Sequence, residues 1–197
     1  MATHCLNCGA DRTGQICEAC GLTDAAAEVI LRRRLLNRTA FFLLGALAFI
    51  FAGSQFPPLD LDGVLIFMGV LFFLTLGLEM WLERRAQKHM EVEALKRIYF
   101  GLVPVPWLLA ALLLMNGGFD RGPKTLWDAR VVSRFAMFGP LPGHRLVVLS
   151  WRLGHHVERI PVGRGDYDRF RPGDSVGVSV SDGLVGIPWV AGVERRE

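Results

Sequence analysis

Three long apolar runs constrain this chain more than any other feature of its sequence. They cover residues 39–56, 63–82 and 98–118, and Glu79 is the only charged residue inside them. At a rise of about 1.5 Å per residue, helices of these lengths reach roughly 27–31 Å, which matches a hydrocarbon core of about 30 Å. A soluble helical bundle is the alternative, but its helices need a polar face that these runs lack. The runs therefore predict three transmembrane helices over residues 39–118.

Composition agrees with a membrane protein whose environment is the lipid bilayer. Hydrophobic residues make up 51% of the 197 residues, and most of the excess over a soluble domain lies between residues 39 and 118. The formal net charge of +3 is small. Because dedicated nucleic-acid binders carry a concentrated basic charge, no nucleic-acid partner is expected.

The distribution of Lys and Arg predicts how the chain is oriented. Five such residues precede the first run, none lies in the loop at residues 55–62, and five lie in the charged loop at residues 83–97. These ten residues are Arg12, Arg32, Arg33, Arg34, Arg38, Arg84, Arg85, Lys88, Lys96 and Arg97. Positively charged segments stay in the cytoplasm. The N-terminus and the loop at 83–97 are therefore expected in the cytoplasm of a bacterium, and the C-terminus outside its inner membrane.

The N-terminal tail holds all four cysteines of the chain. Cys5 and Cys8 form one CxxC pair, and Cys17 and Cys20 form another, each followed by glycine. A CxxC turn directs two thiolates to one point, so two turns supply the four ligands of a tetrahedral zinc site. A reduced cytoplasm favours metal binding over disulfides. Residues 1–22 are therefore predicted to form a zinc-binding unit, followed by an amphipathic juxtamembrane helix over residues 23–38 with Thr23 as its N-cap.

The cysteine pattern resembles the short zinc ribbons at the start of many bacterial membrane proteins. Their pattern runs close to CxxCGxxxxGxxCxxCG, and Gly14 falls on its middle glycine. The resemblance implies a bound zinc ion and no particular activity. Two disulfides, a rubredoxin-like iron site and a redox CxxC pair are the competing interpretations. His4, beside the first pair, is interpreted as a bystander.

The last zone, residues 119–197, changes to short runs separated by Gly, Pro and Asp. The sequence predicts five strands in an antiparallel β-barrel or sandwich outside the membrane. They are expected at residues 131–138, 145–151, 157–162, 175–180 and 185–189, with turns at 139–143, 163–166, 171–174 and 181–183.

Part of this zone resembles a known hairpin. Residues 171–178, with Gly173-Asp174, followed by residues 182–187, are similar to the "GDxVxV…GxxL" hairpin of NfeD-type OB-like domains. They are also similar to periplasmic domains of unknown function that end in a Gly-Ile-Pro-Trp-like strand. The resemblance implies a role in assembly or interaction at the membrane, without catalysis.

The sequence offers a few other polar residues as functional candidates. Glu79 lies near the charged end of the second run, which favours a structural role at the interface over a proton relay. His155, His156 and Glu158 are candidate metal ligands or acid/base groups, but adjacent strand residues face opposite sides, so the two histidines would not easily converge. A solvated strand or turn is therefore expected for them. Pro104 and Pro106 are expected to kink the third span. No nucleophile and base are paired, so the chain is expected not to be an enzyme.

These features lead to a functional expectation. The chain is predicted to be a non-enzymatic integral membrane protein that binds structural zinc and serves as an accessory, scaffold or assembly factor of a membrane complex. The expected partner is another membrane protein or further copies of the chain. The alternatives are a sensor or regulator coupled to the zinc ribbon, or a non-catalytic subunit of a transporter or membrane enzyme.

Overall fold

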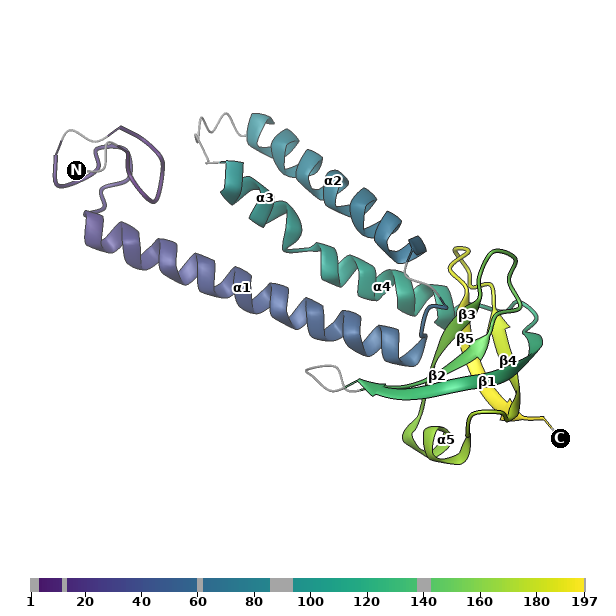
Figure 1. Ribbon diagram of the computed structural model, residues 1–197. Helices are drawn as coiled ribbons and strands as arrows, with labels where there is room; N and C mark the ends of the chain where they lie inside the picture. The colour runs from purple at the N-terminus through teal and green to yellow at the C-terminus, as the bar shows by residue number, and fades with distance from the viewer. Residues whose placement is uncertain (1–3, 12–13, 60–61, 86–93, 138–142, 197) are drawn as a thin grey trace. The chain divides into compact units, whose positions relative to one another are not determined.

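A computed structural model describes residues 4–11, 14–59, 62–85, 94–137 and 143–196 (Figure 1). Arg12, residues 86–93 of the expected charged loop with Lys88, and residues 138–142 of the expected Pro-Gly turn lie outside the described residues. The chain divides into two compact units, which are treated separately below. The first comprises Met1–Ala48 and Met68–Leu108, and the second comprises Phe49–Phe67 and Leu109–Glu197.

Helix α1 (Asp24–Gln55) joins the expected juxtamembrane helix and the first span into one continuous element. The Ala26 amide lies 3.3 Å from the Thr23 hydroxyl, which confirms Thr23 as the N-cap. The helix ends just before Pro57 and Pro58, because proline disfavours helical geometry in the residue before it. Its 32 residues reach about 48 Å, well beyond the hydrocarbon core.

Among the residues that the structure describes, three segments are long and apolar enough to cross a membrane: Asp24–Gln55, Asp62–Leu82 and Ile98–Gly118. The second lies in α2 (Asp62–Arg85). Only 11%, 6% and 33% of the residues in their most apolar windows are buried inside the protein. Most of the surface of the spans is therefore left for lipid or for another membrane protein.

The third span is interrupted, as Pro104 predicted. It consists of α3 (Ala94–Leu102) and α4 (Val105–Gly118), with a turn between them. Because Pro104 has no amide hydrogen, the Phe100 carbonyl loses its regular donor, and the Val103 amide approaches it at 3.3 Å instead. The Thr75 hydroxyl of α2 donates to the Gly101 carbonyl at 2.6 Å. Neighbouring polar groups thus satisfy backbone at the break.

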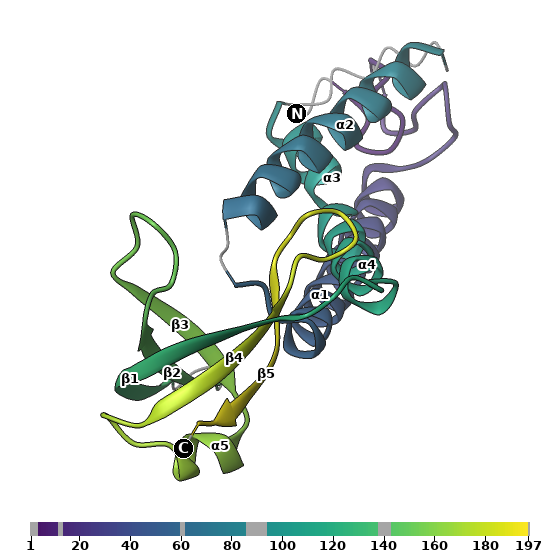
Figure 2. The ribbon, with the colours of Figure 1, turned by 90° about the vertical axis from the view of Figure 1, so that its right-hand side faces the viewer.

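The second unit contains a five-stranded antiparallel sheet in the order β3-β2-β1-β4-β5. Figures 1 and 2 show it as a strongly curved layer with the short helix α5 at one end. Its elements are β1 (Thr125–Met137), β2 (Gly143–Leu149), β3 (Val157–Val162), α5 (Arg164–Arg169), β4 (Ser175–Ser181) and β5 (Trp189–Arg195).

Strand β1 organises this sheet because it pairs with both halves. Its first residues, Thr125 to Arg130, pair with β4, and the stretch from Val131 onward pairs with β2. An irregularity between Val131 and Ser133 marks the change of partner. Side chains from all five strands form one core with Phe170, which follows α5 and is fully buried. Leu59, from the loop between α1 and α2, belongs to the same core.

The structure corrects three expectations for this unit. The sheet is open, so the predicted barrel is wrong. The last strand is Trp189–Arg195 and not residues 185–189, because residues 182–188 form a loop held by polar contacts that are described below. Residues 164–169 form α5, where a turn at 163–166 was expected.

Candidate metal centre

Each CxxC pair forms a tight backbone turn. In the first, the Cys5 amide donates to the Ala10 carbonyl at 2.8 Å, and the Gly9 amide donates to the Cys5 carbonyl at 2.8 Å. The second repeats both bonds around Cys17, at 3.0 and 2.7 Å. The two knuckles are therefore two copies of one local structure, and each presents its pair of thiols on one side.

Glycine is required where each knuckle closes. Gly9 has a φ of 75° and Gly21 has a φ of 69°. Residues with a Cβ rarely adopt this left-handed region. The glycine after each second cysteine is thus explained by backbone geometry alone.

The four cysteine sulfurs converge. The Sγ atoms of Cys5 and Cys20 lie 3.7 Å apart, and those of Cys8 and Cys17 lie 3.5 Å apart. All four lie within 4.8 Å of one another. Ligands about 2.3 Å from a tetrahedral metal are separated by about 3.8 Å, so the thiolates fit one metal ion with no change of fold. A set of four sulfurs suits zinc, and also iron in a tetrahedral site.

The cysteine cluster packs against the first turns of α1. Cys5, Cys17 and Ala27 are 3%, 0% and 0% exposed and form one small core. Thr23, which caps the helix, also pairs with Ile16 in a β-bridge. The segment that carries the four cysteines therefore packs directly against the start of α1.

The surroundings favour the thiolate at Cys5 and Cys17 but the thiol at Cys8. At Cys8 the Ala10 amide lowers the pKa, but burial and hydrogen bonds with the other cysteine sulfurs outweigh it and raise the pKa to about 11. The amides of Cys8 and Asn7 point at the Cys5 sulfur and lower the pKa of Cys5 to about 6. Burial raises the pKa of Cys17, but hydrogen bonds from the backbone of Cys20 and from other groups outweigh it, so the net shift is downward. The positive end of the helix dipole beside the cluster acts in the same direction.

His4 lies outside the cluster. Its Nδ1 is 2.6 Å from Asp11 Oδ1, and both side chains are largely exposed. Within the described part of the chain, the four cysteines are the only group of His, Cys, Asp or Glu side chains close enough to hold a metal.

The other candidate residues from the sequence differ in how far their side chains are exposed. His155 and His156 are exposed, as expected, and Glu79 is half-buried. Glu158 is only 3% exposed, so its expected position on a solvated strand is wrong.

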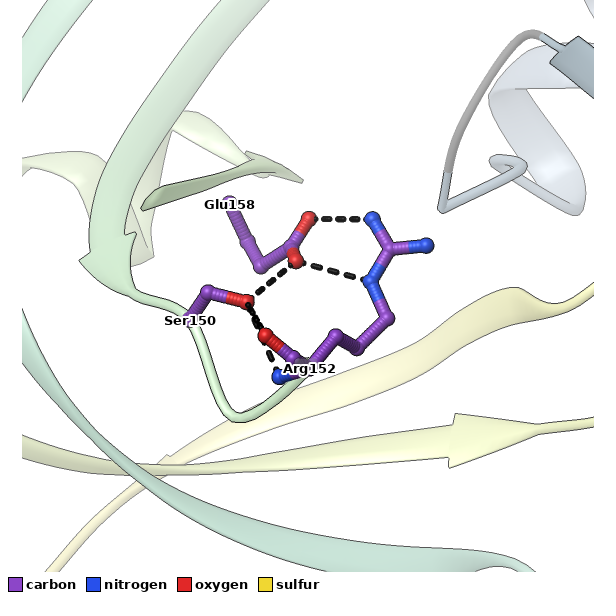
Figure 3. Close-up of polar contacts among 3 residues, drawn as sticks. All are labelled: Ser150, Arg152 and Glu158. Atoms are coloured by element: carbon purple, nitrogen blue, oxygen red, sulfur yellow. Dashed lines mark hydrogen bonds and ion pairs between the residues drawn. The ribbon is translucent and has the colours of Figure 1, made fainter. Parts of the chain in front are cut away.

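Glu158 lies in a polar cluster that closes the β2–β3 connection (Figure 3). The Arg152 guanidinium donates to both carboxylate oxygens, at 2.7 and 2.6 Å, and the Ser150 hydroxyl donates to one of them at 2.7 Å. Despite burial, these donors lower the pKa of Glu158. Every partner is a donor to a carboxylate, so the cluster is suited to holding a loop in place.

A second set of polar residues, which sequence reasoning missed, secures the loop at residues 182–188. Asn116, at the end of α4, is 1% exposed. Its side-chain amide donates to the Ile187 carbonyl at 2.8 Å, and its side-chain oxygen accepts from the Val185 amide at 3.0 Å. Its own carbonyl accepts from the Leu184 amide at 3.0 Å. One residue thus fixes three points of the loop, two through its side chain and one through its main-chain carbonyl.

Asp120 completes this junction. One carboxylate oxygen accepts from the Ser181 hydroxyl at 2.5 Å, the Trp189 indole at 3.0 Å and the Gly183 amide at 3.2 Å. These donors, together with the Gly122 amide, lower the pKa of Asp120, and the Ser181 hydroxyl contributes most. The only sequence signal for this junction was the spacing of Asn116 and Asp120 at the end of an apolar span.

The loop between α1 and α2 also contacts the chain at the start of β5. The Leu59 amide donates to the Pro188 carbonyl at 2.8 Å, and the Val190 amide donates to the Pro57 carbonyl at 3.0 Å. Backbone from two distant parts of the chain therefore pairs at the start of β5.

Comparisons with protein-family models, with curated proteins and with solved structures find no match to this chain.

Proposed function

We propose that this chain is a non-enzymatic, multi-pass protein of a bacterial inner membrane that binds one structural zinc ion and acts as a scaffold or assembly factor. The observation that carries the proposal is the set of four converging cysteine sulfurs. Four thiolates fill every position of a tetrahedral zinc ion and leave none for a substrate or a reactive water. Such a site stabilises a fold and does not catalyse a reaction.

The surface of the spans supports a scaffolding role. Only 6% of the apolar window of the second span is buried within the protein. Phe73 and Leu74, near its middle, are 70% and 63% exposed. This surface suits contact with another membrane protein or with further copies of the chain.

A sensor or regulator is the second candidate function. The packing of the cysteine cluster against α1 favours it. Ala27 is completely buried against Cys5 and Cys17. Loss of the metal would expose this first stretch of α1, so metal occupancy could be communicated to the helix. A scaffold would keep its partner without the metal, whereas a sensor would lose or change that contact.

Metal analysis of the purified full chain tests the site. We expect close to one zinc and no iron per chain, and we expect Cys17→Ser to remove the zinc. Binding would supply folding free energy of about 10 kcal/mol to the ribbon. Ala19→Ser is the matched control, because it changes the same knuckle without removing a ligand. Stoichiometric iron, or full zinc content in Cys17→Ser, would contradict the structural zinc site.

Site-specific crosslinking in the native membrane tests the role. A photoreactive residue at Phe73 should give a discrete protein adduct. A scaffold gives the same adduct in the Cys17→Ser background, and a sensor loses it there but keeps it in the Ala19→Ser background. The absence of any protein adduct from this face would argue against both roles.

A further inference from the structure

Helices α1 and α3 meet in a polar seam at the N-terminal end of the first span. The Thr39 and Tyr99 hydroxyls lie 2.8 Å apart, within hydrogen-bonding distance. The Arg38 guanidinium carbon lies 3.6 Å from the centre of the Phe100 ring. Arg38 is thereby held by a cation–π contact at the level where the apolar run begins.

The contacts next to this seam fix its geometry. The Trp107 indole donates to the Phe41 carbonyl at 2.9 Å, and the two rings stack at 5.2 Å. Gly45 makes room for Trp107, because a Cβ there would lie 2.5 Å from the indole. The hydroxyl pair and Arg38 are therefore presented by packed helices.

The basic residues nearby differ in where they point. Arg34 lies one turn before Arg38, at the i, i+4 spacing that places two side chains on one helix face. Arg32 lies seven residues before Thr39 and lines the same surface hollow, whereas Arg33 lies on another face of α1. All four are exposed, and within the described part of the chain neither Arg34 nor Arg38 is paired with a carboxylate. The seam thus has two guanidinium groups available for an anion.

We propose that this seam binds the phosphate of an anionic phospholipid. Arg34 and Arg38 would supply guanidinium groups, which match phosphate oxygens with two parallel hydrogen bonds. Of the Thr39 and Tyr99 hydroxyls, the one that accepts the mutual bond keeps its own hydrogen to donate to phosphate. The acyl chains would continue along the neighbouring apolar surface. Basic pockets between membrane helices are known to hold such headgroups.

An anionic lipid is favoured over a free phosphate ion as the ligand of this seam. The seam lies where the charged end of α1 meets its apolar run, so a headgroup is delivered there by the bilayer itself. The inference needs only that the helices span a membrane, and it does not depend on the metal site or on the scaffolding role. Its failure would therefore leave the proposed function standing.

The test uses the purified full chain in a neutral detergent. Cardiolipin or phosphatidylglycerol should raise its melting temperature and remain bound in native mass spectrometry. Phosphatidylcholine and inorganic phosphate at the same concentration should do neither. The Arg38→Gln variant should bind anionic lipid about tenfold more weakly, as expected for the loss of one charge-assisted contact.

The control is Arg33→Gln, which removes the same charge from another face of the helix and should bind as the parent does. Equal weakening in Arg38→Gln and Arg33→Gln would overturn the site in favour of a general charge effect. A response to inorganic phosphate equal to the response to lipid would also overturn it. Tyr99→Phe keeps the ring and should weaken lipid binding severalfold, so unchanged binding in this variant would contradict the role of the hydroxyl pair.

Discussion

At the scale of single residues, two carboxylates hold loops of the β-sheet unit: buried Glu158 and half-buried Asp120. Glu158 is almost completely enclosed, and its oxygens are occupied by Arg152 and Ser150. An enclosed carboxylate is stable only when such donors replace water. The geometry therefore explains why Glu158 is charged in the folded protein although it is buried.

Replacing Glu158 should destabilise the β-sheet unit, whereas replacing the adjacent histidines should not. Glu158→Gln leaves Arg152 without its carboxylate and should cost about 1–3 kcal/mol. His155→Ala/His156→Ala removes two exposed side chains and should change stability by no more than about 0.5 kcal/mol. Hydrogen exchange of the β2 and β3 amides measures both effects. Equal protection in the two variants would contradict a structural role for Glu158.

Asp120 predicts a dependence of stability on pH. Its pKa is lowered in the folded protein by donors led by Ser181. Its contribution is therefore fully present above the ordinary aspartate pKa of about 4, and it is lost as the pH falls through the lower folded value. Asp120→Asn should lower the melting temperature by several degrees at pH 7, and the difference from the parent should shrink below about pH 4.

Asp182→Asn is the control for this measurement, because Asp182 is exposed on the same loop. It should melt like the parent over the whole pH range. A difference between Asp120→Asn and the parent that stays constant down to low pH would show that charge is not the cause.

The sequence predicts the features of these sites that depend on residues close together in the chain. It does not predict contacts between residues that are far apart in the chain. The cysteine knuckles are encoded by short spacings, and the Thr23 cap is encoded by its neighbours, so both were found. Glu158 looked solvated because Arg152 lies across a turn whose geometry the sequence does not show. Asp120 and Ser181 lie 61 positions apart, and only the folded chain brings them together.

At the scale of elements, a glycine decides how α1 packs in the first unit. A Cβ at Gly45 would lie 2.5 Å from Trp107, so Gly45→Ala should displace the indole and break its bond to the Phe41 carbonyl. We expect a cost of about 1–3 kcal/mol from this overpacking. Thermal melting of the full chain in detergent measures it.

Gly69→Ala is the matched control on α2, because nothing lies within 4 Å of the position of its Cβ. Alanine favours helix over glycine, so this variant should be neutral or slightly stabilising. If Gly45→Ala were also stabilising, the close packing of Trp107 would be contradicted.

The elements also show which sequence patterns predict structure reliably. The three apolar runs predicted the spans, and Pro104 predicted the break between α3 and α4. The last strand was misplaced because Val185 and Ile187 alternate like strand residues. The Val185 amide is bound by Asn116 and not by a neighbouring strand, and periodicity does not report such a partner.

At the scale of the whole molecule, three crossings should place the two ends of the chain on opposite sides of the membrane. A reporter that is active only in the cytoplasm should work before Met1 and fail after Glu197, and one that needs an oxidising compartment should behave in the opposite way. Reversing the charge of Arg32, Arg33, Arg34 and Arg38 should produce some inverted molecules. Both ends on the same side would contradict the three spans, and a fully inverted parent would remove the reducing environment that favours metal binding.

The break at Pro104 has a consequence for how the chain enters the membrane. Helix α3 has 9 residues and α4 has 14, so neither crosses the hydrocarbon core alone. If this segment left the translocon before its neighbours, the backbone carbonyls around the break would face lipid without a donor. Thr75 of α2 supplies one of those donors. We therefore expect the first two helices to insert as a hairpin, and the third to leave the translocon only when that hairpin is in place to receive it.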